Sequence, residues 1–132
     1  MKTARQYLAR WGEDLAADFL TRRGYQIVDR NVRTPYGEID LIASREVQAS
    51  GSPASRLTVF VEVKTRSSTA YGLPEEAVTS RKRAHLLAAA QEYIRIHPEL
   101  EGDWRVDVVA ILRTGRAALP QIEIFENAVT AE

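Results

Sequence analysis

Apolar side chains recur at helical spacing over residues 3–23. They fall mostly three or four positions apart and form one stripe, made of Leu8, Trp11, Leu15, Phe19 and Leu20. Arg22 and Arg23 follow, where cations suit the negative end of a helix dipole. Gly24 then provides a residue that tolerates the left-handed conformation common after a helix. The pattern therefore predicts an amphipathic helix that ends before Gly24.

A second helix is predicted over residues 81–96. Its apolar stripe repeats at the same spacing and contains Leu86, Leu87, Ala90, Tyr93 and Ile94. Thr79 or Ser80 is expected to cap its first turn, because a hydroxyl side chain there accepts a hydrogen bond from the backbone. Pro98 and Gly102 lie beyond its expected end.

The remaining segments are typical of β-strands, because they are rich in β-branched residues and are bounded by turn residues. These segments are residues 25–33, 37–43, 57–65, 104–112 and 121–125. The resulting order is α-β-β-β-α-β-β, which predicts a single α/β domain with a central mixed β-sheet flanked by helices. The last strand alternates like an edge strand.

Length and composition agree with one ordinary domain. The chain has 132 residues, of which 45% are hydrophobic and 27% are charged. We expect the domain to span residues 1–126, with a mobile loop at 45–56 that is rich in Ser, Gly and Ala, and a frayed tail at 127–132.

Charge and cysteine content exclude several classes of protein. The 18 basic and 18 acidic side chains balance, so only a local basic patch would indicate nucleic acid. The absence of cysteine excludes disulfides and thiolate metal sites. No apolar run is long enough to span a membrane, and the first residues lack the apolar core of a secretory signal. We therefore expect a cytoplasmic protein without a membrane partner.

Two of the predicted strands carry charges that a buried strand should not have. The segment GEIDLIAS holds Glu38 and Asp40, and the segment VFVEVKTRS holds Glu62 and Lys64. Because side chains alternate along a strand, each pair is expected to share one face of its strand. If the two strands pair, three carboxylates and one ammonium group converge.

The apolar neighbours are expected on the opposite faces, with Ile39 and Leu41 together on one strand. Exposed cross-strand ion pairs are an alternative explanation of the charges. Against that alternative, the strands are apolar enough to be covered on both sides. A further charged residue, Asp107, is expected to pair with Arg105 on its own strand.

Clustered carboxylates favour a hard divalent cation. Burying charges costs several kcal/mol each unless they are paired or hold a metal. Mg²⁺ prefers oxygen ligands and is usually held by one or two protein carboxylates, with water and phosphate oxygens completing its shell. A lysine beside such a site would stabilise negative charge that develops on a phosphate.

The motif Asp40…Glu62-Val63-Lys64 resembles that of the PD-(D/E)XK nuclease superfamily. The flanking segments RWGEDLAADFLTRRGY, RNVRTPYGEIDLIA, FVEVKTR and WRVDVVAI together resemble the YraN family of small bacterial proteins, over most of the chain. That family is related in fold to archaeal Holliday-junction resolvases. The resemblance implies a restriction-endonuclease-like fold, a Mg²⁺ cofactor that Mn²⁺ can replace, and hydrolysis of phosphodiester bonds.

The resemblance also implies roles for individual residues. Asp40 and Glu62 match the metal-binding carboxylates, and Lys64 matches the catalytic lysine. Glu13 matches a first-helix glutamate that helps to bind metal in the resolvase-like branch. Glu38 belongs to the YraN-type motif as an accessory residue of undefined role. The proline that often precedes the aspartate in the superfamily is replaced by Ile39.

Basic and aromatic residues near these strands predict a nucleic-acid surface. Its members are Lys64, Arg66, Arg81, Lys82 and Tyr36. Basic side chains bind phosphates without reading sequence, and a tyrosine ring can stack on a base. For the segment SRKR alone, a solvated helix end is the simpler explanation. Cations at a helix N-terminus are nevertheless unfavourable for the helix dipole, and this cost indicates a role such as phosphate binding.

Three functions stay open at this point. The leading hypothesis is a Mg²⁺-dependent endonuclease that acts on DNA, with branched or otherwise structured DNA as a candidate substrate. The second is a non-catalytic module that binds nucleic acid or a partner protein on a nuclease fold. The third is a structural subunit. A homodimer and a protein partner that delivers the substrate are compatible with the first hypothesis. The sequence does not distinguish DNA from RNA.

Overall fold

The computed structural model describes residues 1–48, 50–67, 79–100, 102–113 and 119–130. The elements follow the predicted order of two helices and five strands in a single α/β domain. They are α1 (Ala4–Arg22), β1 (Gln26–Thr34), β2 (Gly37–Val47), β3 (Ser55–Arg66), α2 (Ser80–Ile96), β4 (Trp104–Leu112) and β5 (Gln121–Val129).

The five strands form one mixed sheet in the order β1-β2-β3-β4-β5. The first three strands form an antiparallel meander, β4 is parallel to β3, and β5 returns antiparallel to β4. The parallel step requires a crossover, and α2 lies within it. β5 is an edge strand, as its alternating sequence predicts.

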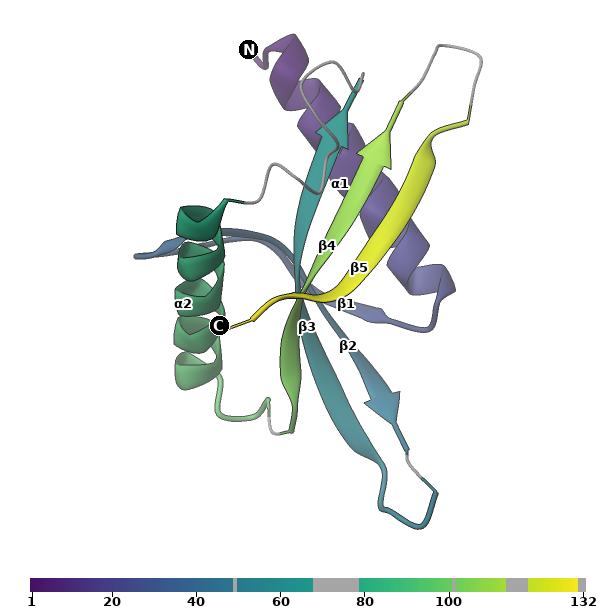
Figure 1. Cartoon of the computed structure of the whole chain (residues 1–132), viewed down its shortest axis with the longest axis vertical. Coiled ribbons are helices and arrows are strands. Elements are labelled where there is room, and N and C mark those ends of the chain that lie inside the picture. Colours follow the sequence, from purple (N-terminus) through teal and green to yellow (C-terminus); the bar gives the residue numbers. More distant parts are fainter. Residues whose placement is uncertain (49, 68–78, 101, 114–118, 131–132) are drawn as a thin grey trace.

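One helix covers each face of the sheet (Figure 1). Ala16 and Leu20 of α1 pack against one face, together with Leu41, Val61 and other buried residues of the strands. The second face carries a separate apolar cluster in which α2 contributes Leu86, Ala89, Ala90 and Tyr93. Strands covered on both faces explain why β3 and β4 are apolar at successive positions.

Both helices begin with a capped first turn. The Thr3 hydroxyl accepts a hydrogen bond from the backbone of Gln6, and the Gln6 side chain accepts one from the backbone of Thr3. The Thr79 hydroxyl accepts a hydrogen bond from the backbone N–H of Lys82 at 3.3 Å, so Thr79 is the cap of α2. Gly24 adopts a φ of 90°, as expected for the residue after α1.

Two predicted boundaries are wrong. β2 extends through Val47 and β3 begins at Ser55, so the connection between them is shorter than the predicted 45–56. Cross-strand pairing of Arg45 with Leu57 lengthens both strands beyond the apolar segment. β5 likewise continues through Val129, which is buried and pairs with Val106, so the tail does not begin at residue 127. Residues 131 and 132 lie outside the described part.

Within the described residues, neither helix is long and apolar enough to cross a membrane.

Candidate metal and nucleic-acid site

The site lies where β2 separates from β3. Pairing between these strands runs up to Leu41 opposite Val61, and the next residues along are Asp40 and Glu62. Beyond that point β2 stays paired with β1, while β3 stays paired with β4. The two carboxylates therefore face each other across the opening between the strands, as the sequence predicts.

The predicted alternation of faces along β2 fails at this point. Ile39 packs into the cluster under α2, whereas Leu41 packs into the cluster under α1. The two residues were expected on one face. Where β2 leaves β3, Ile39 and Ile42 lie on the same side of the sheet, so strict alternation is lost between them. Asp40 lies within this stretch, at the opening between the strands.

Asp40 is held in place by the neighbouring strand. One of its carboxylate oxygens, Oδ2, accepts a hydrogen bond from the backbone N–H of Val63 at 2.8 Å. Burial, followed by the charge of Glu62, raises the pKa of Asp40 to about 8. The Val63 bond opposes that rise without cancelling it. Asp40 thus favours either a proton or a cation at neutral pH.

Glu62 is only 3% exposed and is contacted by two lysines. Its Oε1 lies 3.1 Å from Lys64 Nζ on the same strand and 2.8 Å from Lys82 Nζ on α2. Burial lowers the pKa of Lys64 in spite of the attraction of Glu62. Burial also acts to lower the pKa of Lys82, but the hydrogen bond and charge of Glu62 outweigh it and raise that pKa. Two ammonium groups thus balance the charge of Glu62.

Glu13 approaches the same opening from α1. Asn31 links it to Glu38, because its amide nitrogen donates to Glu13 Oε1 at 3.0 Å and to Glu38 Oε1 at 3.1 Å when turned toward them. Asn31 has a positive φ of 50°, a conformation that asparagine tolerates better than most residues. Burial raises the pKa of Glu13, and the Asn31 hydrogen bond opposes this rise. Glu38 is exposed and lies 4.0 Å from Arg33.

A close approach of α1 to β3 positions Glu13. Gly12 is buried beside Thr65, and a Cβ atom at Gly12 would lie 1.9 Å from the Thr65 hydroxyl oxygen. Only a residue without a side chain fits there. The preceding turn of α1 can therefore lie directly on the end of β3.

Two cavities meet at Asp40 and Glu62. The first has a volume of about 530 Å³ and opens toward α2, where Tyr36, Arg81 and Lys82 line it. The second has a volume of about 360 Å³ and opens toward α1, where Lys64, Arg66 and Glu13 line it. All the basic and aromatic residues predicted for nucleic-acid binding therefore border one of the two cavities, and Glu38 lines the first.

Sequence reasoning missed some residues of the site and interpreted others correctly. Asn31, Arg5 and His85 were not singled out, although Arg5 lines the second cavity and His85 the first. The sequence offered a hint only for Asn31, because asparagine is disfavoured within a β-strand. The predicted pairing of Asp107 with Arg105 is confirmed, with a separation of 3.0 Å between Oδ1 and Nε.

The carboxylates do not by themselves form a complete metal site. Among the residues that the structure describes, no three Asp, Glu, His or Cys side chains are grouped so that they could hold an ion. Asp40 and Glu62 meet at the strand opening, whereas Glu13 is engaged by Asn31. The three-carboxylate set that the resemblance implies is therefore not assembled in this arrangement.

Comparison with known proteins identifies the family. The model described as "Uncharacterised protein family UPF0102" matches residues 12–111. The chain belongs to the UPF0102 family. A UPF0102 protein of Syntrophotalea carbinolica is 41% identical over 134 residues, which cover 97% of this chain and 95% of the relative.

Further UPF0102 relatives show similar agreement. The protein of Syntrophomonas wolfei is 46% identical over 105 residues, covering 80% of this chain and 84% of the relative. The protein of Rhodococcus opacus is 46% identical over 117 residues, covering 89% of this chain and 91% of the relative. The predicted resemblance to the YraN family is thus confirmed, since UPF0102 is that family. The matched range includes Asp40, Glu62, Lys64 and Glu13.

Proposed function

We propose that this protein is a Mg²⁺-dependent nuclease that hydrolyses phosphodiester bonds in DNA. The observation that carries the proposal is the pair Asp40 and Glu62, which meet at the opening of β2 and β3 between two cavities lined by basic residues. Two carboxylates repel a phosphate unless a cation lies between them. A site that only bound nucleic acid would have no use for the pair.

The donor groups suit Mg²⁺. Carboxylate oxygens are its preferred protein ligands, and two carboxylates are enough when water and phosphate complete the shell. Asp40 and Glu62 would hold the ion, and Glu13 would reach it after releasing Asn31. When bound, the ion supplies a Lewis acid that neutralises charge on the phosphate. In its absence, Lys64 and Lys82 supply the positive charge beside Glu62.

The basic side chains have distinct parts in the proposed reaction. A water molecule loses a proton as its oxygen attacks the phosphorus, one P–O ester bond breaks, and the leaving oxygen takes up a proton, so that one water is consumed for each bond cleaved. Lys64 stabilises the negative charge that develops on the phosphate, because its ammonium group lies beside Glu62 in a partly buried position. Arg81 orients the flanking phosphate, since it lines the first cavity beside Thr79, the cap of α2.

The test combines metal binding and cleavage. Mn²⁺ and Mg²⁺ are titrated calorimetrically into the wild type and Asp40→Ala, and both proteins are incubated with labelled flaps, junctions, duplex, single strands and RNA. We expect metal binding that Asp40→Ala abolishes, and cleavage that falls at least about 100-fold in that variant. Asp18→Ala, which removes an exposed carboxylate of α1, is the matched control and should behave as wild type.

A second candidate function is a non-catalytic nucleic-acid-binding module. The two lysines on Glu62 support it, because they balance the charge of that carboxylate without metal. Binding of oligonucleotides without cleavage of any substrate, and without metal uptake, would favour this module over the enzyme. Cleavage that persists in Asp40→Ala would contradict the assignment of the site.

A further inference from the structure

A third cavity extends the site along α1. It has a volume of about 640 Å³ and is lined by Tyr7, Trp11 and Arg113, among others. Arg5, Leu8 and Ser67 border both this cavity and the one that reaches Asp40 and Glu62. The two cavities therefore form one continuous surface. We call this surface, from Arg66 through Arg5 to Tyr7, Trp11 and Arg113, the α1 groove.

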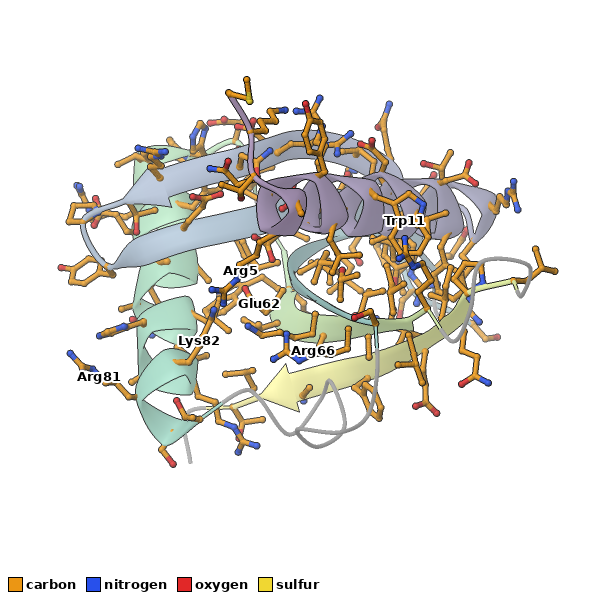
Figure 2. All side chains as sticks on the ribbon, turned by 90° about the horizontal axis from the view of Figure 1, so that it is seen from above. Arg5, Trp11, Glu62, Arg66, Arg81 and Lys82 are labelled. Atoms are coloured by element: carbon orange, nitrogen blue, oxygen red, sulfur yellow. The ribbon has the colours of Figure 1, made fainter. Side chains whose placement is uncertain are left out.

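The α1 groove leads away from the carboxylates on the side opposite α2. Figure 2 shows Glu62 between the Lys82 and Arg81 side chains of α2 and the Arg66 side chain, with Trp11 farther along α1. Tyr7 precedes Glu13 by six residues, which corresponds to about 9 Å along the helix axis. That span matches roughly three nucleotide steps at the spacing of a stacked strand.

The groove combines aromatic rings with cations. Tyr7 is 60% exposed, whereas the other large apolar side chains of α1 are half-buried or buried. The Arg113 guanidinium lies 5.9 Å from the centre of the Trp11 ring. Within the described residues, Arg5, Arg66 and Arg113 form no ion pair with a carboxylate. This composition complements an anion that carries flat apolar rings.

The backbone that carries the rings and cations is held by hydrogen bonds. The capping box of Thr3 and Gln6 orders the first turn of α1, which carries Arg5 and Tyr7. Arg66 and Arg113 lie side by side, because the backbone N–H of Arg113 donates to the carbonyl of Arg66 at 2.9 Å. A fixed arrangement limits the entropy lost when a ligand binds.

We propose that the substrate carries a single-stranded segment, which passes from the Asp40–Glu62 site along the α1 groove and stacks its bases on Tyr7 and Trp11. The proposal rests on the proposed nuclease function and defines its substrate class as a flap, overhang or single strand. Bases within a duplex are stacked on each other and present only their edges in the grooves, so they offer no face to these rings. Unpaired bases stack on aromatic side chains and on arginine.

The test is a binding measurement that requires no metal and no cleavage. Fluorescence anisotropy of labelled 12-nucleotide single strands, blunt duplexes and duplexes with a single-stranded overhang is recorded with EDTA. We expect the single strand and the overhang to bind at least about tenfold more tightly than the blunt duplex. We expect Tyr7→Leu to lower single-strand affinity roughly tenfold, because it removes one stacking ring from an exposed position. Tyr7→Phe should retain the affinity.

The control is Phe19→Leu. Phe19 lies on the same helix and also has an arginine over its ring, Arg23 at 4.5 Å, but it does not line the groove. Trp11→Phe and Trp104→Phe complete the set. In Trp104→Phe, where Trp11 is the remaining tryptophan, single strands should quench the fluorescence and blunt duplexes should not.

Three outcomes would overturn the proposal: equal affinity for blunt duplex and single strand, equal affinity of Tyr7→Leu and Phe19→Leu, or no oligonucleotide binding at all. None of these outcomes decides the nuclease assignment, because metal uptake through Asp40 and cleavage of duplex are measured separately. Conversely, binding along the groove without any metal uptake would support the groove and contradict the nuclease.

Discussion

At the scale of single residues, the site brings together two carboxyl groups, Asp40 and Glu62, and two ammonium groups, Lys64 and Lys82, in a partly buried position. Glu62 pairs with two ammonium groups, whereas Asp40 accepts a hydrogen bond from a backbone N–H. The two carboxylates therefore differ in their electrostatic surroundings. This asymmetry makes Asp40 the group that responds to pH, because its pKa is raised to about 8.

Asp40→Asn should stabilise the protein increasingly as the pH rises. The folded protein holds the Asp40 proton more tightly than the unfolded chain does, so the stability that this proton gives is present at pH 4 and is lost as the pH approaches 8. Asparagine mimics the protonated acid and can still accept from Val63. The difference in unfolding free energy between Asp40→Asn and the wild type should grow by a few kcal/mol as the pH rises, because one pKa unit corresponds to about 1.4 kcal/mol.

Urea unfolding of both proteins at pH 4, 6 and 8.5, in EDTA, measures this difference. Asp18→Asn provides the control, because its carboxylate is exposed and pairs with Arg22 on the same helix. A constant difference between Asp40→Asn and the wild type across this range would contradict the raised pKa.

At the scale of elements, the site depends on how α1 and β2 meet β3. The sequence patterns were sufficient to predict both helices and all five strands, because a period of 3.6 indicates the helices and β-branched residues between turn residues indicate the strands. The spacing of Glu62 and Lys64 placed them on one face of a strand, and their contact confirms it. These features are local, so a single segment of sequence determines each of them.

The remaining features depend on contacts between distant segments. The contact of Lys82 with Glu62 depends on where the crossover helix lies over the sheet. The loss of alternation in β2 beside Asp40 and the left-handed conformation of Asn31 depend on the separation of β2 from β3. Alternation assumes a regular strand, and it therefore failed at Ile39 and Leu41.

Gly12→Ala should destabilise the protein although alanine favours helices. In an exposed helix this change would stabilise by roughly 0.5–1 kcal/mol. Here the new methyl group would meet the Thr65 side chain, so α1 must move from β3 at an expected cost of about 1–3 kcal/mol. The movement also displaces Glu13, and we expect weaker Mn²⁺ binding.

Thermal and urea unfolding measure the effect, and Gly12→Ala/Thr65→Ala tests its cause. Thr65→Ala removes the hydroxyl oxygen, which is the nearest atom, and leaves Cβ at 3.0 Å. Gly12→Ala should therefore cost less stability in the Thr65→Ala background than in the wild type. Additive effects of the two changes would show that the contact is not the reason.

At the scale of the whole molecule, the zero net charge hides an uneven distribution. Both helices run in roughly the opposite direction to β3 and β4, so their amino-terminal ends face the side toward which these strands run, as Figure 1 shows. The positive ends of two helix dipoles therefore lie near the cavities that hold Lys64, Arg66 and Arg81. A local field of this kind attracts phosphates even when the total charge is balanced.

Salt dependence of oligonucleotide binding tests this distribution. Each phosphate contact that is lost reduces the slope of log affinity against log salt by about 0.7 for a single strand. Arg81→Gln removes a cation at the amino-terminal end of α2, so we expect weaker binding and a slope smaller by roughly that amount. Arg95→Gln removes a cation at the other end of the same helix, where Glu92 already pairs with it. It should leave the slope unchanged. Equal changes of the slope in Arg81→Gln and Arg95→Gln would mean that binding follows total charge. The region that holds Asp40 and Glu62 would then not be the phosphate-binding surface.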